Sequence, residues 1–418
     1  MINVFDIQVK QEKSLNDELF NRSDVKKGIA KIKSYWNGRG FESRRELLTG
    51  SLRLTRSMSP EIADSIQACK EILGCTSPIE VYVRPEPMFN AYCLKDLVGP
   101  IIIVLSSRLV ESFTPEELRF VIGHELGHAM YDHFRLPMPA LAKVEHYGVP
   151  LVSRPVALKL FAWTRAAELS ADRVGLICAQ DPEAAASGFF KLASGTSCSR
   201  IKPDLEIYAK QVESLASAPL AREKEYEATR DDLDCFSSHP YSPIRVRAVY
   251  AFSKSDLYAR TMGISIPNAI SDENLEQIIQ QDLALMEPGY LEEKNDESKL
   301  LRRALFTAGV VIASANHVIE DSEIAVLATL LGNDESENIH QQVEVAKKDL
   351  DGRLQEIVDA NISLVKRGQL LQHLTIIAGA DGCIDDLELE ELRRIADKLG
   401  VDFSVVAHTM AAAASPID

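Results

Sequence analysis

The sequence predicts a mainly α-helical protein of the α+β class, with a small β-sheet in its first part and an all-α helical bundle at its end. Two strong helix starts, Ser59-Pro60-Glu61 and Thr114-Pro115-Glu116, place a capping hydroxyl before a proline and an acid. Two runs are typical of β-strands: residues 77–85 alternate apolar and polar side chains, and residues 99–107 are rich in β-branched side chains. The C-terminal segment repeats its apolar spacing at an offset of 65 residues, which is typical of paired helical halves.

These elements follow one another in a definite order. The early helical pattern ends near Gly38 and Gly40, and two further helices are expected over 44–58 and 59–74. After the two strands, the helix that begins at Thr114 is followed by a second long helix over 156–180 and by shorter helices. The four predicted parts are a helical lead-in at 1–44, a domain at 45–261, a linker with one amphipathic helix at 262–295, and the helical bundle at 296–418.

Composition limits the kinds of partner and compartment that fit the chain. The 418 residues carry a net charge of −16, which argues against a general nucleic-acid surface because phosphate binding depends on clustered cations. Of this charge, −10 lies in residues 301–418, with 20 acidic and 10 basic side chains. Seven scattered cysteines without a CxxC pair indicate reduced thiols. With neither a signal peptide nor a long apolar span, we expect a cytoplasmic protein without an integral membrane segment.

The segment His124-Glu125-Leu126-Gly127-His128 is an HExxH motif within an apolar helix. Histidines at i and i+4 lie on one helix face, where both imidazoles can bind one Zn²⁺. Zinc polarises a scissile carbonyl and acidifies its water, and Glu125 is expected to move the proton from that water to the leaving amine. Two histidines and a glutamate are costly on a buried helix unless a metal or partners compensate them.

The third zinc ligand decides the class of metalloenzyme. Tyr131 and Phe134 occupy the positions that a metzincin would fill with Gly and His, so that class is excluded. Glu168 is the best candidate because it lies in an alanine-rich helix with Asp172 one turn later on the same face. Glu168 would bind zinc, and Asp172 would orient a ligand imidazole. Glu145 is a weaker alternative ligand.

Three separated segments resemble the HtpX-like and CAAX prenyl endopeptidase family of gluzincin zinc metallopeptidases. They are Asn90-Ala91-Tyr92 with the following strand and HExxH helix, the sequence RAAELSADRVG around Glu168, and Ser238-His239-Pro240 with Arg245 six residues after the histidine. Together they cover about residues 45–250. The resemblance implies a gluzincin-type metallopeptidase domain with a small edge β-sheet.

The resemblance also implies roles for individual residues. Glu168 is the third zinc ligand, and the strand at Asn90, Ala91 and Tyr92 is the edge along which an extended protein or peptide substrate lies. His239 lines the site, where it would stabilise the oxyanion of the tetrahedral intermediate. Arg245 is expected to hold the acids of the cleft in place.

This chain departs from most members of that family, which have membrane-spanning helices near the HExxH helix. The 39 residues between His128 and Glu168 contain charged side chains, among them Arg135 and Lys159. We therefore expect a soluble form, and membrane quality control or prenyl-protein processing does not carry over.

The C-terminal part resembles a TerB-like tellurite-resistance domain, through ADGCIDDLELEELRRIADKLG and its fainter partner ANHVIEDSEIAVLATLLG. The pattern does not fit an EF-hand calcium loop, because Ile377 and Gly379 occupy the positions of the first two acidic ligands. One interpretation is that Asp381 and Asp385 cap a helix and the other acids form a solvated face. The alternative is a weak divalent-cation or protein-docking surface made of Asp381, Asp385, Glu388, Asn316, Glu320 and Glu323.

The sequence thus predicts a cytoplasmic zinc metalloendopeptidase with one Zn²⁺ in its catalytic domain. The appended acidic bundle would recruit a partner, sense a metal or restrain the catalytic domain. Two other hypotheses remain: a stress-response adaptor that keeps a latent protease fold as a scaffold, and a zinc hydrolase acting on small molecules or peptides.

Overall fold

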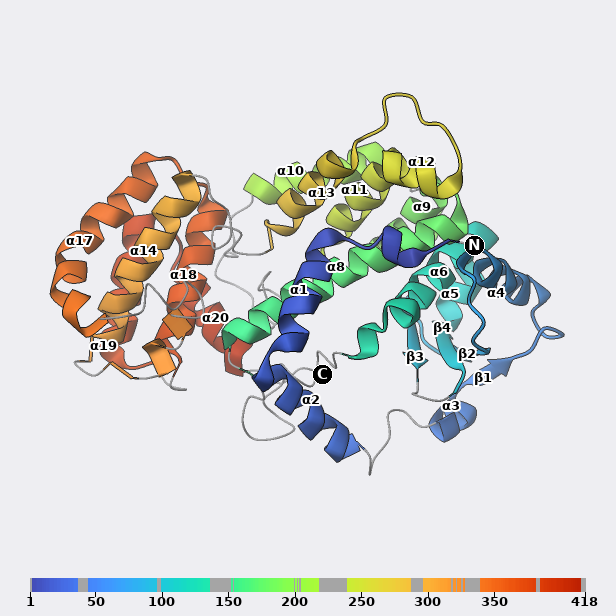
Figure 1. Cartoon of the computed structure of the whole chain (residues 1–418), viewed down its shortest axis with the longest axis horizontal. Helices are drawn as coiled ribbons and strands as arrows, with labels where there is room; N and C mark the ends of the chain where they lie inside the picture. Colours follow the sequence, from blue (N-terminus) through green and yellow to red (C-terminus); the bar gives the residue numbers. More distant parts are fainter. Residues whose placement is uncertain are drawn as a thin grey trace. The chain divides into compact units, whose positions relative to one another are not determined.

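The computed structural model describes residues 2–36, 44–95, 99–135, 152, 154–198, 200, 202, 204–217, 239–286, 296–316, 319–320, 322–324, 326–327, 339–380 and 384–414 (Figure 1). These residues form two compact units. The first contains the described parts of 1–141, 163–212 and 239–283, and the second those of 142–162, 213–238 and 284–418.

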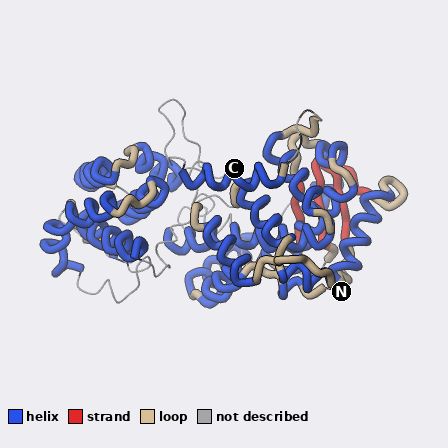
Figure 2. Tube along the Cα trace, turned by 90° about the horizontal axis from the view of Figure 1, so that it is seen from above, coloured by secondary structure: helices blue, strands red, loops and turns tan. Residues whose placement is uncertain are grey.

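The first unit contains a mixed β-sheet, whose strands are red in Figure 2. Its four strands follow the order β1-β2-β4-β3. The parallel neighbours β2 (Ile79–Arg84) and β4 (Ile101–Ser106) form its centre, and β1 (Leu52–Leu54) and β3 (Ala91–Lys95) pair antiparallel at its edges. Every residue of β4 is buried, as expected of a β-branched run in the middle of a sheet. β3 is therefore an edge strand next to the most buried strand.

The helix predicted over 44–58 is wrong in its second half. Helix α3 (Arg44–Gly50) ends at the glycine, and Leu52–Leu54 forms strand β1 instead. Leu52 pairs with Val83 and Leu54 with Val81 of β2. Ladder pairing with a neighbouring strand, which no local pattern reveals, overrides the helical spacing here.

The other predicted helix starts are confirmed. Helix α4 (Pro60–Leu73) follows Ser59 and ends at Gly74, whose left-handed φ of 65° suits glycine. Helix α6 (Pro115–Tyr131) follows Thr114. The remaining helices of this part of the chain are η1 (Val4–Asp6), α1 (Lys10–Asn21), α2 (Ser23–Trp36), α5 (Ser107–Ser112), η2 (His133–Arg135), α8 (Arg154–Ala179), α9 (Pro182–Ser194), α10 (Leu205–Ser217), α11 (Ser242–Ser253), α12 (Asp256–Met262) and α13 (Asp272–Leu283).

Helix α6 occupies the centre of the first unit. It packs against β3, α4 and α9, and the buried residues of its sequence lie on all sides of the helix. The N-terminal segment belongs to the same unit, since the backbone N–H of Val9 donates to Ser170 Oγ of α8 at 2.9 Å. The amphipathic helix expected within the linker is α13, and it packs on α11 in this unit.

The helices of the predicted all-α bundle lie in the second unit, and the fold class is confirmed. Its helices are α14 (Asp296–Ala313), α17 (Ile339–Asp359), α18 (Leu364–Ala378), α19 (Asp386–Leu399) and α20 (Ser404–Ala414). Leucines from several of these helices, such as Leu305, Leu350, Leu374 and Leu392, are fully buried in one core.

Each half of the repeat contains the same kind of local hydrogen bond at the equivalent position. The backbone N–H of Glu320 donates to Glu323 Oε2 at 2.9 Å, and that of Asp385 donates to Glu388 Oε2 at 2.9 Å. Both pairs are separated by the offset of 65 residues that the sequence shows. The repeat is therefore structural as well as sequential. Among the described residues, no helix combines the length and apolar content that a bilayer span requires.

Candidate metal centre

Helix α6 is held firmly at both ends. The side chain of Thr114 accepts a hydrogen bond from Glu117 N, and Glu117 Oε2 accepts one from Thr114 N at 2.8 Å, which forms a capping box. At the other end Asp132 adopts a left-handed conformation with φ 59°, so the chain turns immediately after the helix. The HExxH segment lies in the last two turns of this helix.

Glycines bring α6 close to α8. A Cβ on Gly123 would lie 2.6 Å from Cys178 Cβ, and one on Gly127 would lie 3.1 Å from Ala171 Cα. On the facing helix, a Cβ on Gly175 would lie 2.7 Å from the Phe120 carbonyl oxygen. The two helices therefore pack nearly backbone to backbone, and this packing sets the separation of the side chains that they carry.

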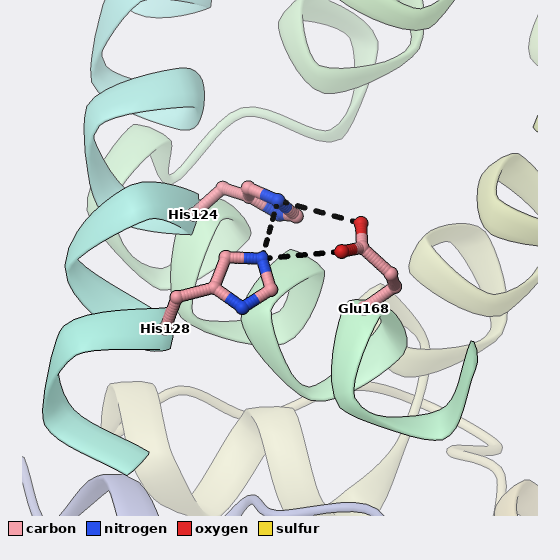
Figure 3. A group of neighbouring side chains, drawn as sticks. All are labelled: His124, His128 and Glu168. Atoms are coloured by element: carbon pink, nitrogen blue, oxygen red, sulfur yellow. Dashed lines mark hydrogen bonds and ion pairs between the residues drawn. The ribbon is translucent and has the colours of Figure 1, made fainter. Parts of the chain in front are cut away.

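His124, His128 and Glu168 meet at this helix pair (Figure 3). Nε2 of His124 lies 3.0 Å from Nε2 of His128. Glu168 Oε2 lies 3.6 Å from His124 Nε2, and Glu168 Oε1 lies 3.3 Å from His128 Nε2. Within the part of the chain that the structure describes, this is the one group of three or more potential metal-ligating side chains.

The donor set fits a zinc ion. Zinc bonds of about 2.0–2.1 Å at tetrahedral angles place neighbouring ligand atoms about 3.3 Å apart, and the three distances scatter around that value. Both Nδ1 atoms already have partners, so each ring directs Nε2 toward Glu168. Two imidazoles and one carboxylate are a typical ligand set of catalytic zinc sites, which keep a fourth position open.

Asp172 and Arg245 support one side of this group. Asp172 Oδ1 lies 2.9 Å from His124 Nδ1, and Arg245 donates to both oxygens of Asp172, at 2.7 and 2.9 Å. Burial raises the pKa of Asp172, but the charge and hydrogen bonds of Arg245 lower it more, so the carboxyl is held ionised. Arg245 Nη2 also lies 3.4 Å from Glu168 Oε2, so one guanidinium compensates both acids of α8.

Glu168 is surrounded by cationic and imidazole groups. Burial raises its pKa, but neighbouring side chains lower it more, and the net pKa lies well below the ordinary value. These side chains are His239, His128 and Arg245. His239, with 63% of its side chain exposed, places Nε2 3.6 Å from Glu168 Oε1. It therefore lies at the mouth of the site.

A second histidine partner lies on the other side of the group. His133 Nδ1 is 2.7 Å from His128 Nδ1, and His133 Nε2 is 3.0 Å from Glu12 Oε1 of α1. The sequence analysis missed both residues. The signal for His133 was its place just beyond the end of the HExxH helix, but nothing in the sequence indicated Glu12.

A cavity of about 670 Å³ opens over the candidate ligands. Glu125 borders it, as do Asn90, which precedes the edge strand β3, and the strand residues Ala91 and Tyr92. Apolar side chains, also missed by the sequence analysis, form another part of the wall: Leu109, Phe120, Val121, Phe134, Phe189 and Leu192. The cavity thus combines a strand edge, a carboxylate and an apolar wall beside the metal-ligating group.

The other residues considered as ligands fall into two groups, those outside the described part of the chain and those with another role there. Glu145 and Asp381 lie outside the described residues. Asp385 accepts hydrogen bonds from the backbone N–H groups of Leu387 and Glu388 and so caps α19. The backbone donor of Glu388 lowers the pKa of Asp385. The capping interpretation accounts for this acid without a cation.

Comparison with known proteins agrees with this geometry. Residues 57–252 match the sequence model of peptidase family M48. This segment is similar to an M48 peptidase domain. Residues 302–410 match the model of the tellurite resistance protein TerB. Both family resemblances are thereby confirmed, while the exact boundaries of the four parts stay predictions.

One curated relative of the M48 domain comes from Arabidopsis thaliana. It is named plastoglobule-localized metallopeptidase 48, chloroplastic, and is 31% identical over 215 residues. The match covers 49% of this chain and 60% of the relative. The chain thus spans somewhat more than half the length of that protein.

Proposed function

We propose that the chain is a zinc-dependent endopeptidase that hydrolyses peptide bonds of protein substrates, with Zn²⁺ held by His124, His128 and Glu168. The observation that carries the proposal is the triangle of two Nε2 atoms and a carboxylate beside Glu125 in one cavity. When bound, Zn²⁺ acts as a Lewis acid that polarises a carbonyl and lowers the pKa of a coordinated water toward ~7.

Glu125 is the proposed general base. It is 6% exposed and borders the same cavity as the three proposed ligands. Its carboxylate accepts a proton from the attacking water as the new C–O bond forms. It then delivers that proton to the amide nitrogen as the C–N bond breaks.

The edge strand β3 is the proposed substrate guide. Its pairing partner is β4, and Asn90, Ala91 and Tyr92 border the cavity. An extended peptide can add to such an edge through backbone hydrogen bonds, while alternate side chains enter pockets. The apolar wall favours substrates with a large apolar side chain next to the scissile bond.

His239 and Arg245 have different proposed tasks. His239 lies at the mouth of the site with an exposed ring, where it can donate to the developing oxyanion. The side chain of Arg245 is 14% exposed and pairs with Asp172 and Glu168, so its proposed task is to position these carboxylates and not to bind substrate.

The TerB domain is the proposed regulatory or docking part, with an acidic surface that suits a protein partner or a weakly bound cation. A site for a specific protease, introduced between residues 287 and 295, would allow the folded protein to be cut in the linker. Unchanged peptidase activity after the cut would argue against restraint by this domain. A cytoplasmic location stays a prediction from the sequence.

The test is a joint measurement of zinc content and cleavage of an unstructured protein. We expect the wild type to bind one zinc and to cleave. Glu125→Gln should keep zinc and lose cleavage, and His124→Ala should lose both. A wild type that binds zinc stoichiometrically but cleaves no peptide or protein would contradict the endopeptidase and favour the scaffold hypothesis.

A further inference from the structure

We propose that His133 and Glu12 are positioning residues for the proposed ligand His128, so that the N-terminal helix α1 completes the metal site. This inference rests on the proposed zinc site. Glu12 lies outside the segment that matches the M48 family model, because that match begins at residue 57.

The hydrogen bonds form a continuous chain from the ligand to a carboxylate. His128 Nδ1 lies 2.7 Å from His133 Nδ1, and His133 Nε2 lies 3.0 Å from Glu12 Oε1. If His128 binds a metal through Nε2, its proton is on Nδ1. His133 must then accept at Nδ1 and donate from Nε2, and a carboxylate is the acceptor that this second bond requires. The chain has one consistent assignment of protons.

The arrangement matches the one at the other histidine. His124 contacts the carboxylate of Asp172 directly, whereas His128 reaches the carboxylate of Glu12 through one intervening imidazole. Carboxylates behind metal-binding histidines fix the tautomer and ring orientation and increase ligand basicity. Both proposed imidazole ligands therefore have an acid behind them.

The relay is buried and held from several sides. Glu12 is 1% exposed and His133 is 7% exposed. The His133 ring stacks on the ring of Tyr131, with centroids 5.3 Å apart, and forms a T-shaped pair with the ring of Trp163, with centroids 5.5 Å apart. Gln8 Nε2 donates to Glu12 Oε1 at 2.7 Å. An ionisable pair is costly to bury, so a pair with this much support indicates a specific task.

The N-terminal segment is attached to the same region by further bonds. The Tyr131 hydroxyl donates to the Val4 carbonyl oxygen at 2.6 Å, and Arg173 donates to the Ile7 carbonyl oxygen at 2.9 Å. Both contacts lie just before α1 on the chain and attach its start to the helices that carry the ligands. The position of Glu12 is therefore set independently of the relay.

The experiment compares Glu12→Gln and His133→Phe with the wild type in the full-length chain. His133→Phe keeps an aromatic ring against Tyr131 and Trp163 and removes both nitrogens. Glu18→Gln is the matched control, because it makes the same change at an exposed position of the same helix. Zinc affinity is measured by chelator competition, and the stability of the zinc-free protein by urea unfolding.

We expect zinc affinity to fall roughly 10-fold in Glu12→Gln and toward 100-fold in His133→Phe, with Glu18→Gln unchanged. A purely structural role would lower the stability of the zinc-free protein and leave the affinity of its folded state as it was. Zinc affinities of both variants within about twofold of the wild type would overturn the inference. A wild type that binds no zinc would instead overturn the proposed metal site itself.

Discussion

Asp172 Oδ1 lies 2.9 Å from His124 Nδ1, and this contact leaves Nε2 of the same ring facing Glu168. The carboxylate thus determines which nitrogen is free for a metal. Asp172→Asn removes the charge behind the ring and should weaken zinc binding by roughly 10- to 100-fold. Chelator competition measures the loss.

A matched control for that variant is Asp256→Asn, at an exposed position in the first turn of α12. It should bind zinc like the wild type. Equal affinities of Asp172→Asn and Asp256→Asn would show that the carboxylate does not act on the ligand.

Arg245 should be important for stability before any metal binds. Arg245→Ala leaves the buried Asp172 without its cation, and removal of one partner from a buried ion pair typically costs about 3–5 kcal/mol. Burial lowers the pKa of Arg245, but the charge and hydrogen bonds of Asp172 raise it more, which agrees with a firmly charged guanidinium. Urea unfolding of the zinc-free protein measures the effect.

The control for this change is Arg260→Ala, which breaks an exposed pair with Asp272. Exposed pairs are screened by solvent and contribute little, so the stability of this variant should be close to that of the wild type. A similar small effect of Arg245→Ala would contradict the proposed role of the guanidinium.

Close packing of α6 on α8 is tested by Gly123→Ala. Alanine favours a helix over glycine by about 0.8–1 kcal/mol, so any destabilisation must come from the contact of the new Cβ with Cys178. We expect lower thermal stability together with weaker zinc binding, because the helices that carry the ligands are forced apart.

Gly352→Ala is the counterpart in α17, where nothing lies within 4 Å of a new Cβ. There the change should stabilise the bundle by up to about 1 kcal/mol in thermal or urea unfolding. If Gly123→Ala were stabilising too, the close approach of α6 and α8 would not limit the site.

Asp282 should make stability depend on pH. Its carboxylate lies 3.2 Å from Arg247 Nε, yet burial raises its pKa from 3.8 to about 6 despite the charge of Arg247. Because the folded pKa is the higher one, the contribution of Asp282 to stability is complete below about pH 4 and is lost as pH rises through about 6. Asp282→Asn should match the wild type near pH 4 and exceed it by up to about 3 kcal/mol near pH 8.

Unfolding in urea at several pH values measures this difference. The control is Asp256→Asn, which makes the same change at an exposed position. A stability difference between Asp282→Asn and the wild type that stays constant from about pH 4 to pH 8 would contradict the shifted pKa.

The sequence predicted the elements whose signals are local. Thr114 with Pro115 marks the start of α6 by capping chemistry, and the i, i+4 histidines have one helix face in common by geometry alone. Strand β1 was missed because its pairing with β2 is a contact between distant segments. Local propensity carries no information about such a partner.

The same distinction separates the site residues. Glu168 and Asp172 could be predicted as site residues because their helix is otherwise rich in alanine and apolar residues, where acids are conspicuous. Glu12 lies in an amphipathic helix with several other charged residues, so the sequence does not distinguish it from a surface acid. Only the packing of α1 beside His133 shows that this acid is buried.

The centre is assembled from stretches far apart along the chain: Glu12, the turn from His124 to His133, Glu168 with Asp172, and Arg245. A growing polypeptide therefore displays the HExxH sequence well before it has synthesised the acid that would share its metal or the guanidinium that keeps that acid charged. The proposed hydrolytic activity therefore requires synthesis of the chain at least as far as Arg245. Until then the proposed peptidase would be inert toward neighbouring nascent chains.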